Sequence, residues 1–175
     1  MNMTLEKTKI YQELESRGVS AKILGNLINL SQCCESILSK VNSAFPHFTN
    51  HDIGHSFRVA DFMCDLLPKS ISDYCETELI VMLYVAMTHD LGMVDDSFEI
   101  KSFEDLETIR KNHHKRSAEM IEDENLFGDG IFSIDEIDIR TEIANISKSH
   151  NESVKWIIDN IKEKSPENLK DGSAA

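Results

Sequence analysis

The sequence predicts an all-α fold, a bundle of about six or seven helices. Apolar residues recur at intervals of three and four through most of the 175 residues, which is the spacing of one buried helix face. Glycines and prolines that end helices separate these segments, and alternation with a period of two is confined to residues 131–139. Hydrophobic residues make up 41% of the chain and charged residues 28%, which is the composition of a globular domain.

Three helices are expected in the first part of the chain. The first is amphipathic and ends near Gly18, a residue suited to a helix C-cap. Ser20 is placed to cap a second, longer helix, which ends where the segment 45–52 brings in a proline. A third helix is expected over about 53–67 and ends at Pro68, because proline cannot continue a helix.

A fourth helix, over about 77–89, contains the most apolar run of the chain, LIVMLYVAM. These residues are too few to cross a bilayer, which needs about 20, so this helix is expected to form the centre of the core. Gly92 follows at a position where a helix would stop. Residues 95–97 are expected in a loop, and Ser102 and Asp105 match the start of a fifth helix.

The remaining chain is predicted to hold an acidic loop and two more helices. Residues 122–130 form the loop. Ser133 and Glu136 have the spacing of a capping box, so the alternation at 131–139 is interpreted as the start of a sixth helix that reaches about Ser147. A seventh helix follows, for which Asn151 is the expected cap.

We expect a single domain over residues 1–164 and a polar, disordered tail over 165–175. The net charge of −13 disfavours binding to long nucleic acids, because it repels phosphate backbones. No apolar run is long enough to span a membrane, and the N-terminus lacks the apolar core of a secretory signal, so a cytoplasmic location is expected. The four cysteines form no CxxC motif and are expected to be reduced thiols.

The seven histidines are spread unevenly along this acidic chain. Imidazoles and carboxylates are ligands of divalent metals, and His51 and His55 are one helical turn apart, so both rings can face one point. At a helix end, His89 and Asp90 can both reach an ion, and a carboxylate there can bridge two ions. Two other histidines fit better as surface or capping residues: His47 and His114.

Two of these segments, HDIGHSFRVADF (51–62) and MTHDLGM (87–93), together resemble the HD-domain superfamily of metal-dependent phosphohydrolases. The resemblance implies that His55, His89 and Asp90 hold a first metal ion. It also implies an HD-type bundle of helices.

Two later segments resemble the members of that superfamily that hold two metals. RKNHHKRSAEMI (110–121) implies that His113 is a ligand, and ISKSHN (146–151) implies the same for His150, both near a second ion. The four segments stand in the order of the superfamily, and the resemblance covers about residues 45–151.

The resemblance extends to the reaction. The pattern around His51 is similar to a helix of cyclic-nucleotide phosphodiesterases, in which the corresponding histidine protonates the leaving oxygen. His51 is therefore expected to be a general acid, with Asp52 orienting it or holding a metal-bound water. Arg116 is a candidate phosphate clamp, whereas Arg58 is expected to pair with an acidic neighbour.

In one respect the chain departs from the superfamily. The ligands of the first ion are usually completed by an Asp on a later helix, in an L-x-x-A-D context that does not occur here. Asp159 is the nearest candidate, but it follows His150 closely and lacks that context. The chain is therefore either a truncated HD domain, with a further domain or partner protein downstream, or an HD domain with an altered site.

The function implied is that of a metal-dependent phosphohydrolase or phosphodiesterase. It would act on a small phosphorylated substrate, such as a nucleotide or cyclic nucleotide. Catalysis would depend on His51 and Asp90, and on one or two divalent ions of Mn, Fe, Ni, Zn, Co or Mg. Two alternatives stay open: a non-catalytic HD-type module that senses a ligand or serves as a scaffold, and a di-iron oxygenase on the same helices.

Overall fold

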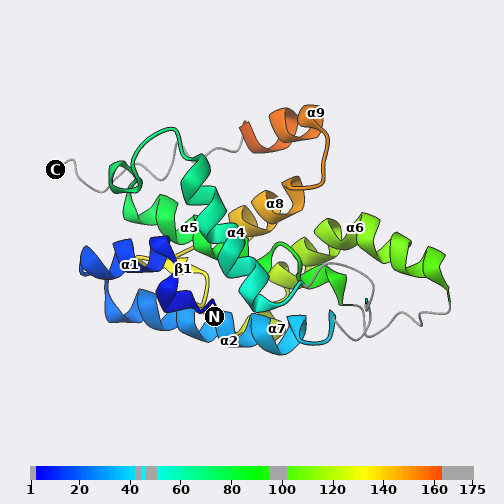
Figure 1. Cartoon of the computed structure of the whole chain (residues 1–175), viewed down its shortest axis with the longest axis horizontal. Helices are drawn as coiled ribbons and strands as arrows, with labels where there is room; N and C mark the ends of the chain where they lie inside the picture. The colour runs from blue at the N-terminus through cyan, green and yellow to red at the C-terminus, as the bar shows by residue number, and fades with distance from the viewer. Residues whose placement is uncertain (1–2, 42–44, 46–50, 95–101, 163–175) are drawn as a thin grey trace.

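The computed structural model describes residues 3–41, 45, 51–94 and 102–162. Over these residues the only strands form one short hairpin, and the predicted all-α fold is confirmed (Figure 1). The α-helices are α1 (Lys9–Ser16), α2 (Ala21–Leu38), α4 (Ile53–Leu66), α5 (Glu76–Thr88), α6 (Phe103–Glu122), α7 (Glu124–Phe127), α8 (Arg140–Ser149) and α9 (Val154–Ile157). Shorter helical turns are η1 (Leu5–Lys7), η2 (Ile71–Asp73), η3 (Leu91–Met93) and η4 (Ile158–Lys162).

Helix α5 lies at the centre of the core, as its apolar run predicts. It contacts α1, α2, α4 and α8, and α4 crosses in front of it in Figure 1. Leu79, Ile80 and Leu83 are fully buried, as is Tyr84, whose hydroxyl donates to the carbonyl of Ile131 at 2.7 Å. Because four helices pack against α5, the residues that follow its last turn, His89 and Asp90, have a fixed position.

Several helix ends are where the sequence places them. Gly18 follows α1 with φ +75°, a left-handed conformation that glycine adopts without steric cost. The Ser20 side chain accepts the N–H of Ile23 at the start of α2. Ser102 and Asp105 form a reciprocal capping box at the start of α6.

The predicted start of the sixth helix is wrong. Residues 133–138 form an antiparallel hairpin of β1 (Ser133–Ile134) and β2 (Ile137–Asp138), and α8 begins only at Arg140. Asp135 and Glu136 both have positive φ, 49° and 69°, which is the backbone of a tight two-residue hairpin turn and is incompatible with a helix. The alternation of apolar residues at 131–139 was therefore the signal of two paired strands and not of a helix start.

Two smaller expectations are also wrong. Ser153, not Asn151, caps α9, since its side chain accepts the N–H of Trp156. The acidic stretch 122–130 is not all loop, because it contains α7, capped by Asp123. His47, the loop residues 95–97 and the tail 165–175 lie outside the described residues. Among the helices the structure describes, none is both long and apolar enough to cross a membrane.

Candidate metal centre

Asp90 is the centre of a cluster of imidazoles. Its side chain is buried, and its two oxygens face different histidines. Oδ2 lies 3.0 Å from His89 Nε2 and 3.5 Å from His55 Nε2, whereas Oδ1 lies 3.2 Å from His113 Nε2. One carboxylate therefore lies between two sets of ring nitrogens, the position from which it could bridge two ions.

The potential ligand atoms form two groups that share Asp90. The first group is His51, His55 and Asp90, and the second is Asp90, His113 and His150. Within each group the ligand atoms lie within 4.8 Å of one another. In the second group the Nε2 atoms of His113 and His150 are 2.7 Å apart, whereas in the first His51 Nε2 is 4.0 Å from Asp90 Oδ2.

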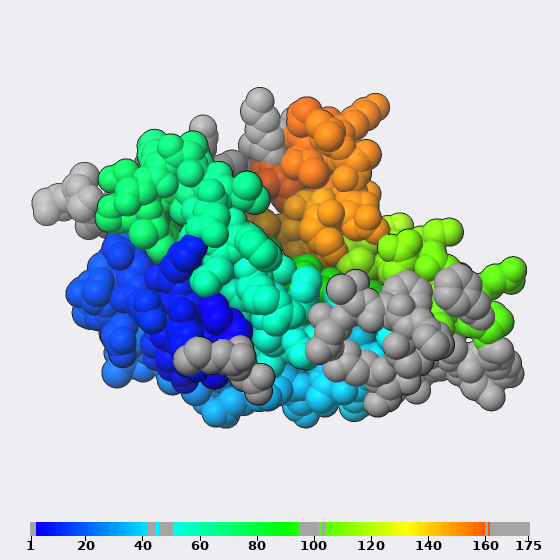
Figure 2. Space-filling model, in the orientation of Figure 1, coloured from blue at the N-terminus to red at the C-terminus, as the bar shows by residue number. Residues whose placement is uncertain are grey.

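Most of these histidines lie at the ends of helices. His55 lies in the first turn of α4, and His51 immediately precedes the cap of that helix, yet their ring centroids are only 5.1 Å apart. His89 is the C-cap of α5, and His150 is the C-cap of α8. In Figure 2 the visible face is hollowed between α4 and the α8–α9 region.

Three of the histidines are fixed through their second ring nitrogen. The Nδ1 atoms of His89, His113 and His150 each bond to the carbonyl oxygen three residues earlier in their own helix. Donation from Nδ1–H leaves the Nε2 lone pair directed at the cluster. An imidazole held in this way by a backbone carbonyl is the usual arrangement of a metal-ligating histidine.

The charges of the cluster also suit a cation. Burial opposes ionisation of Asp90, but the adjacent ring nitrogens of His113 and His89 outweigh it and hold the pKa of Asp90 well below its usual range. Burial lowers the pKa of His55, and it lowers the pKa of His150 to about 4. Burial also opposes the charge of His89, but the carboxylate of Asp90 outweighs it and raises the pKa of His89. Metal binding would displace that proton, because it requires a carboxylate and neutral imidazoles. This nitrogen and oxygen donor set fits divalent ions of borderline hardness.

A family comparison agrees with this geometry. The protein-family model HD-CE matches residues 45–174 and so includes every histidine of the cluster. The chain belongs to the HD-CE family. The expected HD-type domain is thereby confirmed. No curated protein and no solved structure matches the chain.

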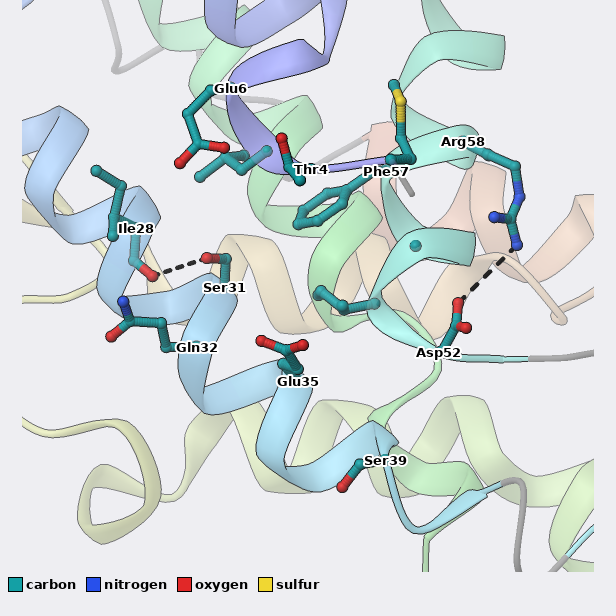
Figure 3. A pocket seen from close by; sticks show the side chains of 14 residues that line it. Thr4, Glu6, Ile28, Ser31, Gln32, Glu35, Ser39, Asp52, Phe57 and Arg58 are labelled. Carbon is teal, nitrogen blue, oxygen red and sulfur yellow. Dashed lines mark hydrogen bonds and ion pairs between the residues drawn. The ribbon is translucent and has the colours of Figure 1, made fainter. Parts of the chain in front are cut away.

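In this HD-CE chain Asp52 acts as a helix cap. Its Oδ1 accepts the N–H of His55 at 2.9 Å and lies 3.9 Å from Nη2 of Arg58, so the expected pairing of Arg58 with an acidic neighbour is confirmed (Figure 3). Both side chains line a pocket of about 590 Å³ between η1, α2 and α4, whose described lining includes no histidine of the cluster. The substrate-binding role of Asp52 stays a prediction.

Arg116 is engaged with the backbone. Its Nε donates to the carbonyl of Val94 at 3.1 Å, which holds the chain after η3 against α6. Its role as a phosphate clamp therefore also stays a prediction. Asp159 lies in η4 and belongs to neither of the two ligand groups found among the described residues.

His114 is not the surface or capping residue that the sequence suggested. It is only 4% exposed, and its Nε2 lies 3.3 Å from Oε1 of Glu152. Asn151 beside it donates to the carbonyl of Lys111 at 3.3 Å. Adjacent helical residues point about 100° apart, so His113 faces the cluster and His114 does not. His114 instead contacts Glu152 and so links α6 to the chain that follows α8. Sequence reasoning had no signal for Glu152.

Proposed function

We propose that this HD-CE chain is a metal-dependent phosphohydrolase or phosphodiesterase that hydrolyses a small phosphate ester, such as a nucleotide or cyclic nucleotide. The observation that carries the proposal is the position of Asp90 between two sets of imidazole nitrogens. Two-metal hydrolytic sites need one carboxylate in that position.

The proposal gives each side chain of the cluster a role. His55, His89 and Asp90 would hold a first ion, and His113 and His150 would hold a second ion that Asp90 also reaches. When bound, divalent ions supply an activated water and stabilise the charge that develops on the phosphoryl oxygens.

His51 is assigned the proton transfer. Its Nε2 lies 4.0 Å from Asp90 Oδ2, farther from the carboxylate than the Nε2 atoms of His55, His89 and His113, and its side chain is partly exposed. A protonated imidazole can donate a proton to a departing alkoxide, whereas a ring that is held as a metal ligand cannot. This position supports the role of general acid.

The charge of the whole chain narrows the proposed substrate. A net charge of −13 repels an extended polyanion, but bound cations dominate the field within their own site. We therefore propose a small phosphorylated substrate and no long nucleic acid.

The test combines metal content with turnover. Metal-free chain is reloaded with Mn²⁺, Ni²⁺, Zn²⁺ or Fe²⁺, its ions per chain are counted by elemental analysis, and nitrophenol release from p-nitrophenyl phosphate and its bis ester is followed. Asp90→Ala is expected to lose ions and turnover together. Asp73→Ala, an exposed aspartate of η2, is the matched control and should keep both. Absence of bound metal under these conditions contradicts the proposal.

One observation favours a second candidate. Asp159 is not in either ligand group of the described residues, and the superfamily pattern lacks its last Asp here, so the chain can instead be a metal-binding module without turnover. Ions that bind with no hydrolysis of any ester would support the module. An iron chromophore that reacts with oxygen would support an oxygenase instead.

A further inference from the structure

The turn that carries His89 and Asp90 lies directly against α6. A Cβ added to Gly92 would be 2.1 Å from the carbonyl oxygen of His113 and 2.7 Å from the backbone nitrogen of Ser117. Gly92 does not have positive φ, so the glycine is required by this close approach and not, as the sequence suggested, by a helix stop. The backbone of the turn therefore has almost no freedom to shift relative to α6.

Ser117 bonds to this turn on both sides of Asp90. Its Oγ donates to the carbonyl of His89 at 2.7 Å and accepts the N–H of Gly92 at 2.9 Å. The Ser117 side chain is fully buried, so water cannot replace either partner. One hydroxyl thus satisfies two backbone groups that flank the central carboxylate.

Ser117 also stands one helical turn after His113, on the same helix. The hydroxyl that holds the backbone around Asp90 and the imidazole that faces Asp90 Oδ1 at 3.2 Å are therefore parts of one rigid segment. We propose that Ser117 is a positioning residue that sets Asp90 against His113 and thereby forms the second ligand group. This inference rests on the metal centre of the proposed function.

The same fold supplies a control serine. Ser147 in α8 is equally buried, and its Oγ lies 3.2 Å from the hydroxyl of Thr88. Among the described residues, its side chain makes no hydrogen bond to the backbone around Asp90. Ser117→Ala and Ser147→Ala each delete one buried hydroxyl, so a general loss of stability should be similar in both variants.

The experiment is a calorimetric titration of the metal-free full chain with Mn²⁺ and, in parallel, Zn²⁺. A His150→Ala chain identifies which binding step belongs to the second group. Ser117→Ala is expected to weaken that step by about tenfold or more, the usual effect of removing a group that orients a ligand, and to change the first step by less than about threefold. Ser147→Ala should leave both steps within about threefold.

A metal-free measurement separates this inference from the proposed function. The ¹⁵N resonance of His113 Nε2 is sensitive to the distance of this nitrogen from the Asp90 carboxylate, which is 3.2 Å, so it should shift in Ser117→Ala and stay in place in Ser147→Ala. If the wild-type chain binds no ion, the proposed function fails and this resonance still decides the role of Ser117. Unchanged binding steps together with an unchanged resonance overturn the inference. If Ser117→Ala does not fold, Ser117→Cys takes its place, because a thiol donates and accepts only weakly.

Discussion

The Nε2 atoms of His113 and His150 lie 2.7 Å apart, although each ring already bonds through Nδ1 to a carbonyl of its own helix. Two neutral rings held in this way would direct their lone pairs at each other. A divalent ion bound between them would accept both lone pairs and remove the repulsion. Asp90, 3.2 Å from His113, adds the negative charge that favours the ion.

Removal of one histidine of this pair should therefore remove one ion. His113→Ala deletes a ligand of the second group only, so the number of bound ions is expected to fall from two per chain to one. Native mass spectrometry of the loaded chain gives this count directly. Retention of both ions in His113→Ala would show that the second group does not bind metal.

His51 should behave differently from a ligand. His51→Gln is expected to keep the metal content while slowing hydrolysis of an alkyl phosphate by about 10²-fold or more, because such a leaving group needs a proton. Hydrolysis of p-nitrophenyl phosphate should fall much less, since nitrophenolate leaves without protonation. Equal losses on both esters, or a parallel loss of metal, would refute the role of general acid.

The metal-free protein should lose stability as the pH falls from about 6.5 to about 4. In the folded chain burial lowers the pKa of His150 to about 4, so over this interval the unfolded chain binds more protons and low pH favours unfolding. The stability is fully present above pH 6.5. Because part of the His150 side chain is exposed, we expect a contribution of about 1 kcal/mol.

The measurement is urea unfolding at several pH values in the presence of a chelator. His150→Gln removes the titrating group, so the difference between the two chains isolates His150 from His55 and His89. The wild-type curve should be steeper between pH 6.5 and 4. Parallel curves would contradict the prediction.

The sequence correctly predicted the helices that are specified by residues close together in the chain. The three-and-four spacing of α2, the cap Ser20 and the uninterrupted apolar run of α5 depend on neighbours within a few turns. The hairpin at 133–138 was missed because Ser133 and Glu136 also match a capping box, and only the positive φ values of the turn distinguish the two.

The candidate metal ligands could be predicted from the sequence, but the residues that hold them in place could not. His55, Asp90 and His113 carry chemistry that spacing and resemblance reveal. Ser117 and Glu152 act through contacts 28 and 38 residues away in the sequence, and serine and glutamate are too common to be noticed without the fold.

Two glycines give a matched test of the contact between the turn at Asp90 and α6. Gly92→Ala places a methyl group 2.1 Å from a backbone oxygen that cannot move aside, so we expect a loss of about 3 kcal/mol in the free energy of unfolding, together with weaker metal binding. Gly25→Ala, in the interior of α2, places its added carbon more than 4 Å from every atom outside the local backbone and chain neighbours, so it should stabilise the chain by about 0.5–1 kcal/mol. Urea unfolding and metal titration of both variants give the comparison. A Gly92→Ala chain as stable and as metal-competent as the wild type would mean that the turn does not depend on its close approach to α6.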